Sequence, residues 1–169
     1  MYKQGDIILV GFNKKFAKIM RFFQSDPVDW GHAVIVGKNN KVYSLEIKME
    51  IEDIDKYLKS QGKYKVFRYN KMIDDKRDFM MRVLKRFEDI DYGWKRLFLF
   101  FLDNLFGTRY FTKICKDKKS QVCSSFISWL YYSAFKIKFN GLDWSSCDPD
   151  DLDDHCSRDE DWTIVHVEV

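Results

Sequence analysis

The sequence predicts an α+β fold in which a small, mostly antiparallel sheet packs against helices. Short runs that are apolar or that alternate between apolar and polar residues recur along the chain, separated by turn residues. Longer segments repeat their apolar residues at helical spacing. The 169 residues contain no internal repeat and no Pro/Gly-rich linker. We therefore expect one domain that spans residues 1–169.

Five segments have the apolar or alternating pattern that predicts a strand. In chain order they are Ile7–Val10, His32–Val36, Val42–Ile47, Tyr64–Tyr69 and Thr163–Val169. The turn residues Gly37–Lys41 predict that the second and third strands form a hairpin. The segment Ile51–Leu58 is ambiguous, and we interpret it as a turn of helix.

Helical spacing of apolar residues predicts four helices. They are Lys14–Phe23, Asp74–Phe87, Trp94–Phe106, and a helix from Ser120 or Gln121 to Ala134 that Ser120 caps. Within the third, Leu97–Leu102 is an unbroken apolar run. A helix buried on most sides explains this run, as does a wall for an acyl chain or a peripheral membrane contact.

Charge and apolar content limit the classes of partner and the compartment. The 29 basic and 26 acidic residues give a net charge of +3, which is too balanced to predict nucleic-acid binding. No signal peptide is recognisable at the start, and no apolar run approaches the roughly 18 residues that span a bilayer. We expect a cytoplasmic protein whose four cysteines are reduced.

Cys123 stands at the predicted start of a helix, beside small polar residues. Unpaired amide N–H groups and the helix dipole favour a thiolate there, and the same N–H groups can bind an oxyanion. A nucleophilic thiol also needs a base. Without one, Cys123 is better interpreted as a buried structural cysteine.

His32 is the histidine best placed to be that base, because it opens a predicted strand after Asp29–Gly31. If Val36 faces Val42 across the hairpin, His32 faces Glu46. The carboxylate could then orient the ring and leave one nitrogen to take a proton. A register one residue longer would separate the two side chains onto opposite faces, and Glu46 would be an exposed edge residue.

The remaining histidines predict no metal site and no cofactor. His166 alternates with valines in the last predicted strand. His155 and Cys156 follow Cys147 at a spacing that does not match the usual zinc-ligand pairs.

Taken together, these motifs resemble the circularly permuted papain-like enzymes of the NlpC-type superfamily, most closely the YiiX/YaeF-like group. The matching segments are Gly5–Leu9, Gly31–Val36, Val42–Glu46, Asp91–Gly93, Val122–Ile127 and Asp148–Leu152. A histidine that precedes the cysteine marks the permuted form. The sequence differs from many relatives within His32–Ile35 and at Ser125, positions that affect the shape of the pocket.

The resemblance implies a permuted papain-like fold with the catalytic cysteine at a helix N-terminus. It implies that Cys123 is the nucleophile, that His32 is the general base and acid, and that Glu46 orients His32. We expect Trp30, Tyr92 and Ser124 to contact the substrate.

The expected activity is a cysteine-dependent amidase or peptidase that acts on a peptide or amide. A lipid-directed acyltransferase, thioesterase or phospholipase with the same triad is the first alternative. A binding module that keeps the fold without catalysis is the second.

Overall fold

The computed structural model describes residues 1–11, 29–45, 49–86 and 123–168. These residues form an α+β fold around a six-stranded sheet in the order β4-β3-β2-β1-β5-β6, in which all neighbouring strands are antiparallel. The strands are β1 (Ile7–Val10), β2 (His32–Val36), β3 (Lys41–Leu45), β4 (Met49–Asp53), β5 (Tyr64–Tyr69) and β6 (Trp162–Glu168).

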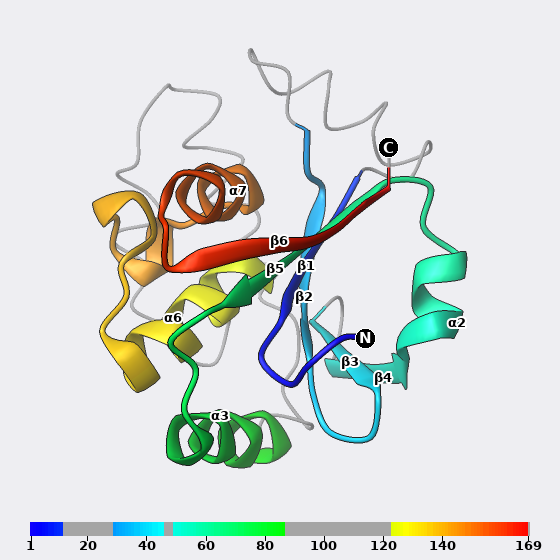
Figure 1. Cartoon of the computed structure of the whole chain (residues 1–169), viewed down its shortest axis with the longest axis horizontal. Helices are drawn as coiled ribbons and strands as arrows, with labels where there is room; N and C mark the ends of the chain where they lie inside the picture. The colour runs from blue at the N-terminus through cyan, green and yellow to red at the C-terminus, as the bar shows by residue number, and fades with distance from the viewer. Residues whose placement is uncertain (12–28, 46–48, 87–122, 169) are drawn as a thin grey trace.

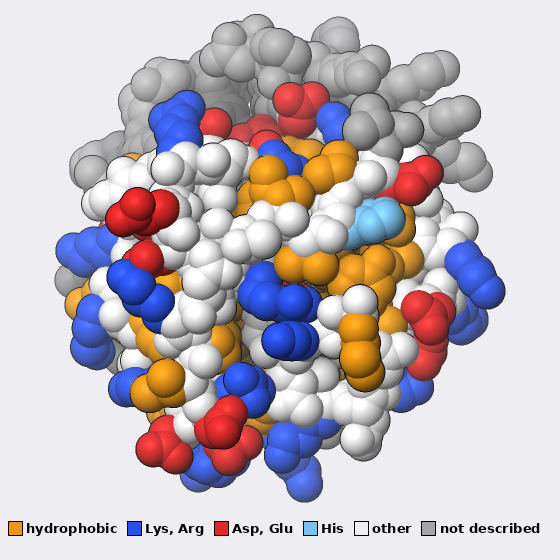
Figure 2. Space-filling view, in the orientation of Figure 1, with side chains coloured by type: hydrophobic (Ala, Val, Ile, Leu, Met, Phe, Trp, Pro, Cys, Tyr) orange, Lys and Arg blue, Asp and Glu red, His pale blue; other side chains and the backbone are white. Residues whose placement is uncertain are grey.

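Helices cover both faces of the sheet, with α2 on one side and α3, α6 and α7 on the other (Figure 1). The α-helices of the described residues are α2 (Ile54–Lys59), α3 (Asp74–Arg86), α6 (Cys123–Phe135) and α7 (Pro149–Arg158). Two 3₁₀ turns, η1 (Phe139–Gly141) and η2 (Trp144–Ser146), connect α6 to α7. Acidic and basic side chains are interspersed on the face that Figure 2 shows.

Strand alternation divides the buried residues into two apolar clusters. In β2, Ala33 and Ile35 belong to the larger cluster, together with α3, α6 and α7. Val34 and Val36 belong to the smaller cluster, which α2 covers. Because both faces of β1 and β2 are covered, these central strands are almost entirely apolar.

The β2–β3 hairpin has the predicted register, with Val36 opposite Val42 and Val34 opposite Ser44. Its turn has positive φ at both Asn39 (55°) and Asn40 (56°), the backbone of a type I′ turn. The Lys41 amide N–H donates to the Lys38 carbonyl at 3.2 Å and closes the turn. The prediction of Val34 opposite Ser44 is therefore confirmed.

The predicted strands at Ile7–Val10, His32–Val36 and Tyr64–Tyr69 are confirmed, and β6 confirms the last strand over its described length. The third strand runs over Lys41–Leu45 in the described residues. The helix predicted from Asp74 is confirmed to Arg86, and the helix ending near Ala134 is described from Cys123 onward. The predicted helices Lys14–Phe23 and Trp94–Phe106, and the Ser120 cap, lie outside the described residues.

The interpretation of Ile51–Leu58 as a single turn of helix was wrong in its first half. Strand β4 runs to Asp53, and α2 begins only at Ile54. Asp53 ends the strand because its side chain accepts the amide N–H groups of Asp55 (3.1 Å) and Lys56 (3.4 Å), which caps the helix.

Helix α7 was not predicted, although its start carries a recognisable signal. The Asp148 side chain accepts the Asp151 amide N–H at 2.8 Å, and the Asp151 carboxylate accepts the Asp148 amide N–H at 3.1 Å. Pro149 follows the cap at the first helical position. This reciprocal capping, with Asp151 in the position more often held by Glu, explains why an acidic stretch forms a helix.

Candidate functional site

Cys123 is the first described residue of α6, a 13-residue helix that contacts β2. Its side chain is buried, with 7% exposed. The residue that follows Cys123 is tied to the segment before α7, because the Ser124 hydroxyl donates to the Cys147 carbonyl at 2.8 Å. The Ser125 hydroxyl also points to that carbonyl, at 3.5 Å. These contacts hold the helix start, where the predicted nucleophile lies.

His32 is the first residue of β2 and lies opposite Val10 of β1. The amide N–H of the preceding residue, Gly31, donates to the Val10 carbonyl at 2.9 Å. The backbone that leads into the predicted base is therefore tied to β1.

Ser44 is a partner of His32 that the sequence did not predict. Its Oγ lies 2.8 Å from His32 Nε2, and the residue is 3% exposed. Because Ser44 lies opposite Val34, it is the diagonal neighbour of His32 on one face of the hairpin. The contact could have been predicted from the register of the hairpin, since that register places His32 and Ser44 on the same face.

Glu46, the predicted orienting residue, lies outside the described residues, directly after the end of β3. Continuing the observed register by two residues would place it opposite His32. That pairing stays a prediction, while the Ser44 contact is a feature of the structure.

The predicted nucleophile lies on a helix that packs against one side of the sheet. The side chain of the predicted base lies on the other side. Helix α6 packs with Ala33 and Ile35 of β2. The alternation of β2 and the Ser44 contact place the His32 ring on the side of Val34. A reaction between ring and thiol therefore requires the two side chains to meet at the start of β2, where His32 lies.

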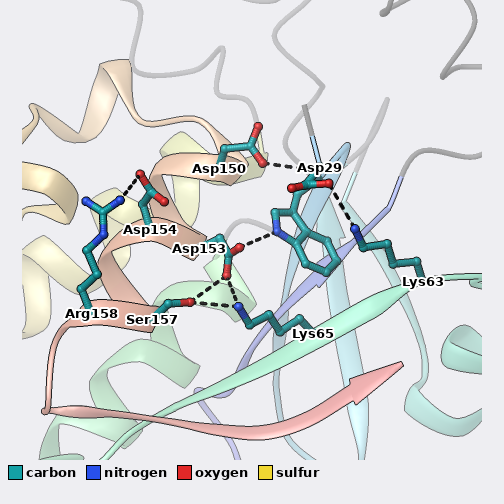
Figure 3. A network of polar contacts seen from close by, with 9 residues as sticks. Asp29, Lys63, Lys65, Asp150, Asp153, Asp154, Ser157 and Arg158 are labelled. Atoms are coloured by element: carbon teal, nitrogen blue, oxygen red, sulfur yellow. Dashed lines mark hydrogen bonds and ion pairs between the residues drawn. The ribbon is translucent and has the colours of Figure 1, made fainter. Parts of the chain in front are cut away.

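Trp30, predicted to contact substrate, is 4% exposed, and its N–H groups donate to Asp150 and Asp153 of α7, two residues labelled in Figure 3. Its amide N–H donates to the Asp150 carboxylate at 3.1 Å, and its indole N–H donates to Asp153 at 2.8 Å. The Lys63 ammonium lies 4.7 Å from the ring centroid. These contacts make Trp30 part of the framework that precedes His32.

Asp150 has an unusual protonation equilibrium. Burial is the largest cause that raises its pKa, to about 7, and the negative charges of Asp148, Asp29 and Asp153 act in the same direction. The hydrogen bond from the Trp30 amide acts in the opposite direction and stabilises the carboxylate. A carboxyl group that titrates near neutral pH is thus hydrogen-bonded to Trp30, which precedes the predicted base by two positions in the sequence.

The other predicted substrate contacts differ in what the structure describes. Ser124 is 2% exposed, and its hydroxyl is engaged with Cys147. Its backbone amide, at the start of α6, is the group through which it could contact a substrate. Tyr92 and the apolar segment Trp94–Phe106 lie outside the described residues.

Among the described residues, no group of three or more His, Cys, Asp or Glu side chains could hold a metal ion. Cys147 and Cys156 are buried in the larger apolar cluster, and the His155 ring packs edge-on against Phe139. In the same described ranges, no helix combines the length and apolar character needed to cross a bilayer.

The structure is similar to a crystal structure of the metalloprotein YiiX from Escherichia coli O157:H7. The TM-score is 0.57 at 16% sequence identity, and the match covers 98% of this chain and 97% of that one. No protein-family model and no curated protein sequence matches the chain. At this identity the similarity establishes the architecture alone, which is a YiiX-like α+β fold.

Proposed function

We propose that the protein is a cysteine-dependent acyl-transfer hydrolase of the amidase or peptidase type, with Cys123 as nucleophile and His32 as general base. The observation that carries the proposal is the placement of the two residues. Cys123 is the first described residue of α6, α6 contacts β2, and His32 opens β2. The likeness to YiiX in fold supports the proposal, because this arrangement was expected from the same group.

In the proposed reaction, the His32 imidazole takes the thiol proton of Cys123, and the sulfur attacks a substrate carbonyl carbon. A C–S bond forms, and amide N–H groups at the start of α6 stabilise the oxyanion. The bond to the leaving nitrogen or oxygen then breaks as the imidazolium donates its proton to that atom. Water, deprotonated by His32, hydrolyses the thioester and regenerates the thiol.

Ser44 has a defined part in this scheme. Neutral imidazole must carry its proton on one nitrogen and leave the other free to accept. A hydroxyl 2.8 Å from Nε2 can orient the ring through that nitrogen, which leaves Nδ1 for the thiol proton. We propose that Ser44 orients His32, alone or together with Glu46.

We propose a cytoplasmic location for this chemistry, where glutathione keeps cysteine side chains reduced and so preserves a nucleophilic thiol. We propose a peptide, amide or acyl-lipid substrate and no role for nucleic acid, because neither sign of charge dominates the sequence.

Intact-protein mass spectrometry after incubation with acyl substrates tests the proposal. We expect p-nitrophenyl butyrate to leave a butyryl group on Cys123, and the adduct to be lost in Cys123→Ala. His32→Ala should slow acylation about 100-fold or more, whereas His166→Ala, which changes an exposed histidine of β6, should not. Acylation of Cys115 or Cys147 instead would contradict the assignment.

The same experiment separates the substrate classes. Turnover of peptide amides supports the amidase or peptidase. An adduct formed only from phospholipid vesicles would favour the lipid-directed acyltransferase or phospholipase. Absence of any adduct from all three substrate classes would favour a binding module that keeps the fold without catalysis.

A further inference from the structure

Asp150 and Asp153, which Figure 3 labels on α7, accept both N–H groups of Trp30. Asp150 accepts the backbone N–H at 3.1 Å, and Asp153 accepts the indole N–H at 2.8 Å. Residues three apart on a helix project to the same side, so the helix presents both acceptors to one tryptophan. Residues 120 and more positions apart in sequence are thereby fixed to each other.

The carboxylate of Asp153 is itself held in place. The Lys65 ammonium of β5 lies 2.6 Å from its Oδ1, and the side chains of both residues are mostly buried. The Ser157 hydroxyl donates to the same oxygen at 3.0 Å. The indole therefore donates to an acceptor that the sheet and the helix both orient, which favours one position of the tryptophan.

These contacts bear directly on the backbone from which His32 projects. Trp30 is fixed to α7, and the amide N–H of the next residue, Gly31, donates to the Val10 carbonyl of β1 at 2.9 Å. The two residues before His32 are thus tied to two different elements. A backbone held on both sides restricts the direction of the side chain that follows it.

We propose that Asp150 and Asp153 are positioning residues of the reaction, which hold His32 in its productive orientation through Trp30. The inference rests on the proposed function, in which His32 is the general base. It goes beyond that function by assigning a task to the acidic segment of α7. The two aspartates touch neither substrate nor thiol, and they act through the tryptophan backbone and indole.

Trp30→Phe is the sharpest variant, because it removes the indole N–H while an aromatic ring, smaller than the indole, and the backbone N–H remain. Asp153 keeps Lys65 and Ser157 as partners in this variant. We expect kcat for p-nitrophenyl butyrate to fall about 10-fold, with KM nearly unchanged. A substrate-contacting tryptophan would instead raise KM.

A pair of substitutions at Asp150 gives a rescue test. Asp150→Ala removes the acceptor of the Trp30 amide and should also lower kcat about 10-fold. Asp150→Asn keeps a side-chain oxygen at the same place and should retain nearly wild-type kcat. Asp154→Ala is the matched control, because this exposed residue of α7 pairs with Arg158 of the same helix and should not change kcat.

Nuclear magnetic resonance of the histidine rings reports positioning without any turnover. We expect Trp30→Phe to shift the His32 ring signals and their titration midpoint, while the signals of His166 on β6 stay in place. Thermal unfolding of each variant identifies any that lose kcat only because they fail to fold.

The outcomes distinguish the two levels of the account. If His32→Ala leaves acylation of Cys123 unchanged, the proposed function is wrong. If His32→Ala abolishes acylation while Trp30→Phe and Asp150→Ala keep wild-type kcat and His32 signals, the positioning role alone is wrong. Equal loss of kcat in Asp150→Asn and Asp150→Ala would also overturn it.

Discussion

At the scale of single residues, Asp150 makes the folding stability depend on pH. Its pKa is raised to about 7 by burial and by neighbouring carboxylates. An acid whose pKa is higher in the folded state stabilises the fold most when both states are protonated. This contribution is complete below the ordinary carboxyl pKa of about 4 and is lost as the pH rises through 7.

Asp150→Asn tests this titration, because the amide stays neutral and keeps an oxygen for the Trp30 amide. We expect its advantage in the free energy of unfolding over the wild type to grow between about pH 4 and pH 7, reaching about 2 kcal/mol. Urea denaturation at pH 4.5, 6 and 8 measures it. Asp154→Asn, on the same helix, is the control. Parallel pH profiles of Asp150→Asn and wild type would contradict the prediction.

At the scale of elements, the β2–β3 hairpin carries the His32–Ser44 contact, so its turn sets the geometry of the site. Both central residues, Asn39 and Asn40, have positive φ. Asparagine tolerates this backbone and glycine adopts it without steric cost. Asn40 therefore allows the turn to form and to set the register, although glycine would adopt the same backbone at a lower steric cost.

Asn40→Gly should stabilise the protein by about 0.5 kcal/mol, because Asn-Gly is the favoured type I′ pair. Asn40→Ala should destabilise it by about 1 kcal/mol, since alanine resists positive φ. Thermal unfolding monitored by circular dichroism compares the two. Destabilisation by glycine would show that the Asn40 side chain, and not its backbone, stabilises the turn.

The elements also show what the sequence could and could not predict. Apolar runs were sufficient to predict β1 and β2, because central strands with two buried faces are strongly apolar. Alternation was sufficient for β5, and the turn residues for the hairpin register. Strand β4 was missed because its burial does not alternate along the strand: Met49 is buried, whereas both Glu50 and Ile51 are exposed. Helix α7 was missed because its acidic residues obscured the reciprocal capping of Asp148 and Asp151.

The same limits explain which residues of the candidate site the sequence predicted and which it missed. The choice of Cys123 and His32 followed from one residue at a predicted helix start and one at a predicted strand start. Ser44 and the Trp30–Asp153 contact were missed because they depend on side-chain reach. The latter joins segments 123 residues apart, which no local pattern reveals.

At the scale of the whole molecule, Tyr131 joins the middle of α6 to the start of the sheet. Its hydroxyl donates to the carbonyl of Gly5, which precedes β1, and the side chain is fully buried. The ring also contacts Tyr69, Phe139 and Trp162, so it links several elements of the larger cluster. This contact fixes the helix that begins with Cys123 against the strands.

Tyr131→Phe should destabilise the protein by about 1–2 kcal/mol, because it removes a donor from a buried carbonyl while keeping the ring. Tyr132→Phe, at a partly exposed position of the same helix, should change stability by less than about 0.5 kcal/mol. Urea denaturation measures both. Equal effects of the two variants would show that the Gly5 contact contributes nothing specific.

The central claim is that Cys123 and His32 act as a pair, and the pH dependence of Cys123 alkylation by iodoacetamide tests it most directly. A thiolate stabilised by imidazolium reacts well below the pH at which an ordinary thiol ionises. We predict that wild-type Cys123 is alkylated rapidly at pH 6 and that His32→Ala loses this reactivity while remaining reactive at pH 9. Identical pH profiles for the wild type and His32→Ala would contradict the account.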